Sequence, residues 1–112
     1  MTLEKAEVLQ GTLDLMVLKT LETMGPMHGF GIARRIEQVS GAVFKVNPGS
    51  LLTALRRLER SGWLAAEWRR TESSRRAKFY FLTPSGRRQV EVETADWERR
   101  AGAVQRLLDA EA

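Results

Sequence analysis

A chain of 112 residues and 12.7 kDa can form one domain with a hydrophobic core, and a domain of this size gains stability from dimerisation. The absence of cysteine excludes disulfide frameworks, thiolate metal sites and cysteine nucleophiles, and it fits a reducing cytoplasm. No apolar run approaches the length of a membrane span, and the first residues, which include Glu4 and Glu7, lack the pattern of a signal peptide. We therefore expect a soluble cytoplasmic protein.

The first part of the chain carries two helical patterns. Residues 1–8 are expected to form a loosely held arm. From Leu9 onwards apolar residues recur at steps of three and four as far as Gly25-Pro26, which predicts a first core helix. Its apolar stripe consists of Leu9, Leu13, Met16, Val17, Leu21 and Met24. A tight connection at 27–31 then leads into a second amphipathic helix that closes at Ser40-Gly41.

The second helix is expected to bury one side and expose the other. The buried side is predicted to consist of Phe30, Ala33, Ile36 and Val39, with Arg34, Arg35 and Glu37 outside. After this helix the alternation over 44–46 allows a brief extended piece, which would tuck Phe44 or Val46 into the core.

The best-marked element is a helix over 48–61. Asn47 is a good N-cap, Pro48 suits the first helical position, and Gly62 stands where a left-handed residue is wanted. A helical period places Leu51, Ala54, Leu55 and Leu58 on one stripe, and Ser50, Thr53, Arg56, Arg57 and Arg60 on the other side. Leu52 projects from the flank. This polar side is a candidate DNA-reading surface, although a charged outer face is often merely solvated.

The segment after this helix is predicted to form a basic hairpin, with strands at 63–68 and 77–82 around a polar loop at 69–76. From Arg56 to Arg88 there are ten Arg or Lys residues against three acids, a net charge of +7 in a chain of net charge +4. The remaining residues therefore carry −3 together. One concentrated basic surface on an otherwise mildly acidic protein indicates a polyanionic partner.

A last helix is expected to begin after Thr83 as its cap, with Pro84 in the first turn, and to run to about Leu108. Its apolar residues step by four and three as in a coiled coil. The seam consists of Val90, Thr94, Trp97, Ala101, Val104 and Leu108, and Leu107 is added to the predicted dimer contacts. The partner of this seam is either the protein's own first helix or the same helix of a second copy. We favour a homodimer, because one small domain cannot readily cover three heptads of seam.

Two helices joined by a short connection and followed by a hairpin describe a winged helix-turn-helix. The predicted fold is thus mainly α with a small β-hairpin. It comprises a DNA-binding domain at 1–83 and a C-terminal dimerisation helix at 84–112.

Four stretches of this sequence are similar to the PadR family of bacterial transcriptional regulators. They are residues 9–15 (LQGTLDL), 25–32 (GPMHGFGI), 46–63 (VNPGSLLTALRRLERSGW) and 76–86 (RAKFYFLTPSG). The resemblance covers nearly the whole chain, and the length is similar to the short subclass with a single C-terminal helix. It implies a cytoplasmic, dimeric DNA-binding regulator, most often a repressor released by a ligand or another signal.

Two departures from the family pattern fall on candidate functional positions. Leu52-Thr53 stands where the family usually has Tyr-Pro, and that Tyr commonly faces DNA, so Leu52 keeps only an apolar contact such as one with a thymine methyl. Phe30 replaces a frequent Tyr, which we expect to matter less because a core ring would lose only its polar tip.

The candidate DNA contacts follow from side-chain chemistry. Guanidinium groups can grip phosphate or guanine, and hydroxyls near a helix start can donate to phosphate or base edges, with local helix capping as the alternative for Ser50 and Thr53. A basic wing can follow the DNA backbone or the minor groove, and Arg76 could also brace the hairpin. The predicted DNA-binding residues are Asn47, Ser50, Leu52, Thr53, Arg56, Arg57, Arg60, Arg69, Arg70, Arg75, Arg76 and Lys78.

Other activities have weaker support in the sequence. His28 is the only histidine and lies in a glycine-rich turn, so a structural role is favoured over catalysis or metal binding, and neither an enzyme nor a cofactor is expected. Some relatives hold flat aromatic ligands between C-terminal helices, which makes Trp97 a candidate for contact with a small aromatic effector. A winged-helix module that joins protein complexes is the main alternative function. RNA binding is a weaker one, because the aromatic residues look buried in strands.

Overall fold

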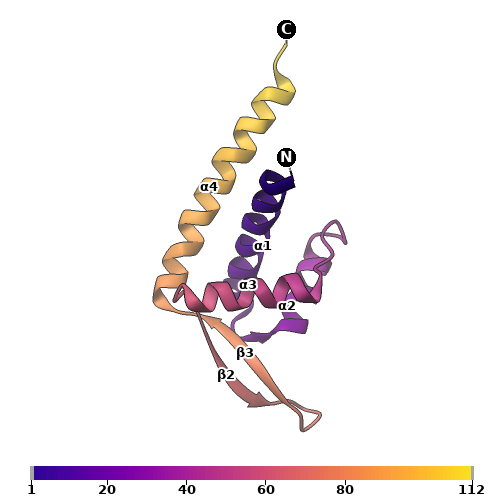
Figure 1. Cartoon of the computed structure of the whole chain (residues 1–112), viewed down its shortest axis with the longest axis vertical. Coiled ribbons are helices and arrows are strands. Elements are labelled where there is room, and N and C mark those ends of the chain that lie inside the picture. The colour runs from indigo at the N-terminus through magenta and orange to yellow at the C-terminus, as the bar shows by residue number, and fades with distance from the viewer. Residues whose placement is uncertain (1, 112) are drawn as a thin grey trace.

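The computed structural model describes the backbone of residues 2–111 and the side chains of residues 11–111. Its elements are α1 (Thr2–Met24), β1 (Met27–His28), α2 (Gly29–Val39), α3 (Pro48–Arg60), β2 (Leu64–Arg70), β3 (Arg76–Leu82) and α4 (Pro84–Asp109) (Figure 1). The predicted class, mainly α with a small β-hairpin, is confirmed.

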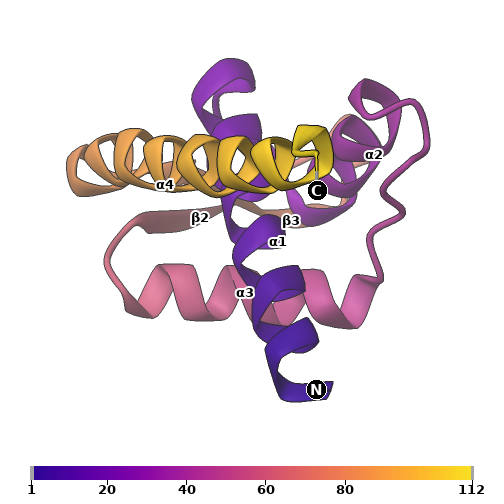
Figure 2. The same cartoon turned by 90° about the horizontal axis from the view of Figure 1, so that it is seen from above.

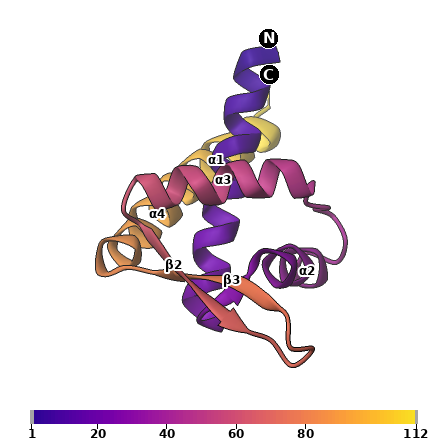
Figure 3. The same ribbon diagram turned by 60° about the horizontal axis from the view of Figure 1, so that its bottom comes forward.

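The core lies where the first three helices meet the base of the hairpin. Its buried side chains are Val17, Leu18, Leu21, Ile32, Ile36, Leu51, Leu55, Leu58, Leu64, Tyr80, Leu82 and Val90. Helix α3 crosses α1, as the views in Figure 2 and Figure 3 both show. One side of α3 therefore packs on the core, and the opposite side faces solvent.

The ends of α3 are those that the sequence predicts. The Asn47 side-chain oxygen accepts hydrogen bonds from the backbone N–H groups of Gly49 at 2.8 Å and Ser50 at 3.2 Å. Pro48 occupies the first turn, and Gly62 follows the last turn with a φ of +80° that suits glycine. The predicted apolar stripe is buried throughout: Leu51, Ala54, Leu55 and Leu58.

The sheet has one more strand than the sequence predicts. The strand order is β1-β3-β2, all antiparallel, with Met27 opposite Tyr80 and His28 opposite Phe79. A two-residue strand carries no periodic signal, so nothing in the sequence marks it. Its pairing attaches the start of α2 to the base of the hairpin.

The start of α4 is fastened to the turn that follows α3. Thr83 caps α4, and the hydroxyl groups of Thr83 and Ser85 both donate to the Gly62 carbonyl oxygen, at 2.6 and 2.9 Å. Gly86 lies against the Trp63 carbonyl group, which accepts a hydrogen bond from the Thr83 N–H. Beyond this junction α4 crosses over α1, as Figure 2 shows, and the molecule is elongated, at 61 × 28 × 26 Å (Figure 1).

Several expectations about the first half of the chain are wrong. Residues 2–8 are helical and belong to α1 instead of forming an arm, and the side chain of Leu9 lies outside the described residues. Phe30 and Val39 are 73% and 68% exposed, because α2 turns Ile32 to the core together with Ile36, which was expected there. Met24 is also exposed.

The connection at 44–46 forms no strand, and of its two candidates it is Val46 that packs against the core. Phe44 stays 39% exposed, with its N–H bonded to the Ser40 hydroxyl at 3.1 Å.

Candidate nucleic-acid interface

Helix α3 presents a polar outer side. Ser50, Leu52, Thr53, Arg56 and Arg60 are all exposed, as the helical period predicts. The Thr53 hydroxyl donates to the Gly49 carbonyl at 3.0 Å, so its donor is used within the helix and an oxygen lone pair remains for a ligand. The Asn47 oxygen is engaged in capping. The groups best placed to meet a ligand are therefore Ser50, Leu52 and the two exposed arginines.

Arg57 does not share this outer side. Its Nη2 donates to the Asp14 carboxylate on α1, and the two side chains are 28% and 15% exposed. The prediction that Arg57 lies with Arg56 and Arg60 is wrong, because helical periodicity gives only the approximate direction of a side chain. A long side chain at the edge of the polar sector can turn inwards when a carboxylate lies within reach.

The hairpin carries a basic face on the same side as α3. Trp68 lies opposite Lys78 and Arg70 opposite Arg76, so alternation along the strands places all four on one face of the hairpin. Trp68 is 59% exposed and the Arg76 guanidinium lies over its ring at 5.6 Å. The expectation that the aromatic residues of the strands are buried is therefore wrong for Trp68. Its position could have predicted this exposure, because Trp68 lies toward the tip of the hairpin and the core reaches only the base.

The cross-strand pair of Arg70 and Arg76 is the most informative feature of this face. Like charges directly opposite each other on one face of a sheet destabilise the strand pairing. Both side chains are exposed, and neither is among the ion pairs of the described residues. An anionic ligand that neutralises them would remove this repulsion.

The other cations of the hairpin have partners within the protein. Arg69 lies on the opposite face, where it pairs with Glu67 and covers the Phe79 ring at 5.3 Å. Lys78 donates to Glu59 of α3 at 3.2 Å, and this hydrogen bond raises the pKa of the Lys78 ammonium. Lys78 thus ties the hairpin to α3. Arg69 and Lys78 therefore differ from Arg70 and Arg76, although nothing in the sequence tells these four cations apart.

A groove of about 760 Å³ separates the start of α3 from the hairpin. Pro48, Leu51 and Leu52 line it on the α3 side, and Arg75 and Arg76 line it on the hairpin side. In Figure 3 the hairpin tip and the start of α3 both lie on the right side of the view. Phe30 also lines this groove, so the ring predicted for the core lies beside the candidate interface instead.

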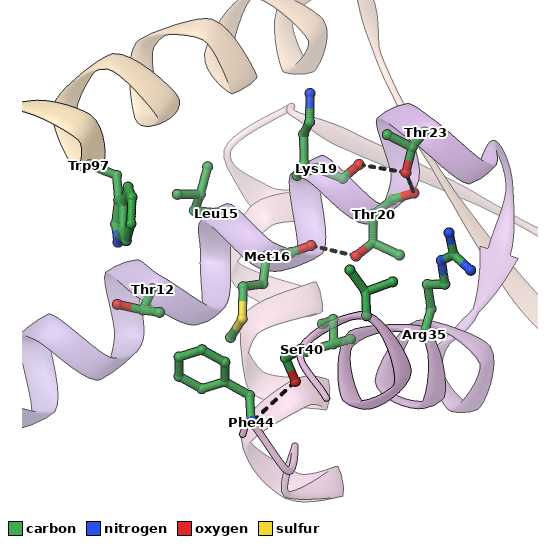
Figure 4. A pocket seen from close by; sticks show the side chains of 12 residues that line it. Thr12, Leu15, Met16, Lys19, Thr20, Thr23, Arg35, Ser40, Phe44 and Trp97 are labelled. Carbon is green, nitrogen blue, oxygen red and sulfur yellow. Dashed lines mark hydrogen bonds between the residues drawn. The ribbon is translucent and has the colours of Figure 1, made fainter. Parts of the chain in front are cut away.

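A second cavity, of about 530 Å³, lies between α1, α2 and α4. Its lining is largely apolar and includes Leu15, Met16, Ile36, Phe44 and Trp97. Figure 4 shows the Met16 side chain extending toward the Phe44 ring, with Trp97 entering from α4. The volume falls in the range of sites for small organic ligands.

The predicted seam of α4 divides into two parts. Val90 is buried in the core of the chain itself, so it is not available to a partner helix. Trp97 and Val104 are 50% and 54% exposed, and Leu107 and Leu108 are exposed by about three quarters at 76% and 73%. Thr94 and Ala101 are half-buried. The distal half of α4 therefore displays apolar side chains that the rest of the chain leaves uncovered.

His28 has the structural role that the sequence predicts. Its Nδ1 accepts a hydrogen bond from the Gly31 N–H at 3.0 Å and so caps α2. Its ring also meets the Phe79 ring edge-on, at 5.5 Å between centroids. Both contacts belong to the junction of β1, β3 and α2.

Helices α1, α2 and α3, of which α3 is the capped outer helix, together with the basic hairpin define a winged helix-turn-helix protein. The model of the transcriptional regulator PadR-like family matches residues 17–92, and the chain belongs to this family. The members of this family are transcriptional regulators. None of the helices in the described part of the chain is both long and apolar enough to cross a membrane.

Solved structures agree with this assignment. A PadR family transcriptional regulator from Eggerthella lenta is 27% identical, with a TM-score of 0.76 over 98% of this chain and 93% of the other. A transcriptional regulator from Clostridium thermocellum has a TM-score of 0.79 at 23% identity, over 89% of this chain and 93% of the other, which supports the fold.

A curated relative, an uncharacterized 37.1 kDa protein in a transposon of Streptomyces fradiae, is 41% identical over 80 residues. The match covers 71% of this chain, which spans about a fifth (21%) of that relative's length.

Proposed function

We propose that this protein is a sequence-specific regulator that binds double-stranded DNA through the outer side of α3 and the basic face of the hairpin. The observation that carries the proposal is the facing pair Arg70 and Arg76, which repel each other on the side of the hairpin turned to α3. Arg56 and Arg60 add exposed charge nearby. In this arrangement α3 enters the major groove, and the hairpin cations meet phosphates.

The α3 contacts are assigned by chemistry. Arg56 and Arg60 bind phosphate or guanine, Ser50 and Thr53 contact phosphate or base edges, and Leu52 packs on a thymine methyl. Asn47 stays at the edge of this set, since its oxygen caps the helix. On the hairpin, Arg70, Arg75 and Arg76 carry the phosphate contacts, whereas Arg69 and Lys78 support the hairpin itself.

The active species in this proposal is a homodimer that represses from an inverted-repeat operator in the cytoplasm. The uncovered apolar residues on the distal half of α4 support dimerisation, and a two-fold dimer presents two recognition helices to two half-sites. The repressor role rests on resemblance to the family. A small flat aromatic effector in the cavity beside Trp97 is the proposed releasing signal, because an indole face offers stacking in an apolar space.

A protein-interaction module remains the second candidate, favoured by exposed apolar residues such as Phe30 and Val39. Selection of bound fragments from a random duplex pool distinguishes the two functions. We expect enrichment of inverted repeats whose half-site centres lie about 10 base pairs, or a multiple of this, apart. Affinity for the selected duplex should fall steeply with salt, by about 0.9 in the log–log slope for each neutralised phosphate. Absence of enrichment together with a flat salt response would refute DNA binding.

A further inference from the structure

We propose that Asp14 and Arg57 form a brace that fixes the orientation of α3 on α1, and that Arg57 serves DNA reading as a positioning residue without touching DNA. The inference rests on the proposed function of α3. It changes the role of Arg57, which the sequence pattern grouped with Arg56 and Arg60 on the outer side of the helix.

The geometry of Arg57 separates it from its neighbours on α3. Its Nη2 bonds to the Asp14 Oδ1, across 43 positions of sequence and between two different helices. Its Nε is fully buried, so the inner edge of the guanidinium group faces away from solvent. Arg56 and Arg60 are exposed on the same helix. The bond to Asp14 draws this guanidinium toward α1 and away from the outer side, where Arg56 and Arg60 are free to meet phosphate.

The pair supplies a directional contact where α3 crosses α1. Apolar side chains such as Val17 and Leu58 pack these elements together, but ridges and grooves of helices fit at more than one angle. A charge-assisted hydrogen bond between an arginine and a carboxylate depends on both distance and orientation. It therefore fixes the rotation of α3, and with it the direction in which Ser50 and Arg56 project.

The electrostatics of Asp14 agree with a positioning role. Burial raises the pKa of the Asp14 carboxyl, and the hydrogen bond and charge of Arg57 only partly oppose this effect. Repulsion from Glu93 on α4 raises the pKa further. Keeping Asp14 ionised at neutral pH therefore opposes folding instead of favouring it, and ion pairs of this kind can serve specificity when they add little stability.

Binding of the selected duplex by Asp14→Asn, Arg57→Gln and the double variant tests the brace. If Arg57 were a DNA contact, Asp14→Asn would release it and strengthen binding. We expect the reverse, a loss of about tenfold in operator affinity for each single variant. The double variant should lose less than the two single losses combined, because both substitutions remove the same contact.

The salt dependence separates a brace from a phosphate contact. Arg57→Gln should leave the log–log slope of the parent unchanged. Arg56→Gln, with the same charge change one residue earlier, should reduce the slope by about 0.9 for each phosphate that the protein no longer neutralises. Arg57→Lys keeps the charge, can still reach Asp14, and should bind more tightly than Arg57→Gln. Thermal unfolding of each variant confirms that it is folded at the assay temperature.

A slope reduced by Arg57→Gln, stronger binding by Asp14→Asn, or fully additive losses would each overturn the brace. Failure of the parent protein to select or bind any duplex would instead refute the proposed function, so the two failures are distinguishable.

Discussion

Gly86→Ala is expected to destabilise the protein by about 3 kcal/mol or more, the upper end of the cost of overpacking a rigid site. A Cβ at this position would overlap the Trp63 carbonyl oxygen and lie 2.9 Å from the carbonyl carbon. These are backbone atoms fixed between α3 and β2, so they cannot turn aside as a flexible side chain can. Chemical denaturation monitored by circular dichroism measures the loss.

Gly102→Ala is the matched control on the same helix. Its Cβ would meet the Arg106 Nη1 at 3.6 Å, an ordinary contact with a mobile side chain. Replacing a glycine inside a helix by alanine then stabilises by roughly 0.5 to 1 kcal/mol. The two substitutions, identical in chemistry, should therefore shift stability in opposite directions. Equal effects would show that α4 does not approach the turn after α3 as described.

Trp97→Ala is expected to dissociate the proposed dimer at micromolar concentration. The Trp97 side chain is 50% exposed, and it is the first and largest of the exposed apolar residues along α4 that a second copy would cover. Truncating a large aromatic anchor of this kind costs around 3 to 5 kcal/mol. Sedimentation of the variant beside the parent measures dissociation, and binding to the inverted-repeat operator is followed in parallel.

Val92→Ala controls for the loss of an exposed apolar residue on α4. Val92 is 52% exposed but lies on the side of the helix away from the seam, so this variant should stay dimeric. Dissociated Trp97→Ala should keep a weak electrostatic affinity for DNA and lose paired half-site recognition. If Trp97→Ala stayed dimeric and bound the operator normally, Trp97 would serve only its own protomer.

Elements with local signals could be predicted from the sequence alone. Helix α3 has a capping residue, a proline in its first turn and a glycine after its end, and each of these acts through the neighbouring backbone. The cap of α4 by Thr83 is local in the same way. Exposure of Leu52 followed from the helical period, which depends on no other element.

Features that depend on distant partners could not be predicted in this way. Strand β1 exists because β3 offers it an edge, and Arg57 turns inwards because α1 places Asp14 beside it. Periodicity put Phe30 in the stripe of α2, but the core contacts one sector of that helix, and Ile32 and Ile36 fill it. The positions of the α3 and hairpin residues on DNA, and the division at residue 83, stay predictions.

The two facing arginines of the hairpin are expected to lower the stability of the free protein while they favour DNA binding. Two arginines opposite each other weaken the hairpin of the free protein, and neutralisation by phosphate would relieve this cost only in the complex. DNA binding should therefore strengthen the strand pairing at the tip of the hairpin. The ion pair of Lys78 with Glu59 meanwhile holds the hairpin on α3, at the pair of residues next to the core side of this face.

The salt dependence of binding by two charge-matched double variants tests the central claim most directly. Arg70→Gln with Arg76→Gln removes two cations from the hairpin face, and Arg99→Gln with Arg106→Gln removes two from the side of α4 opposite the seam. We predict that the hairpin variant lowers the log–log slope for the selected duplex by about 0.9 for each phosphate left without its cation, while the α4 variant keeps the slope of the parent. Equal slopes for the hairpin variant and the parent, or equal reductions in both double variants, would contradict the proposed interface.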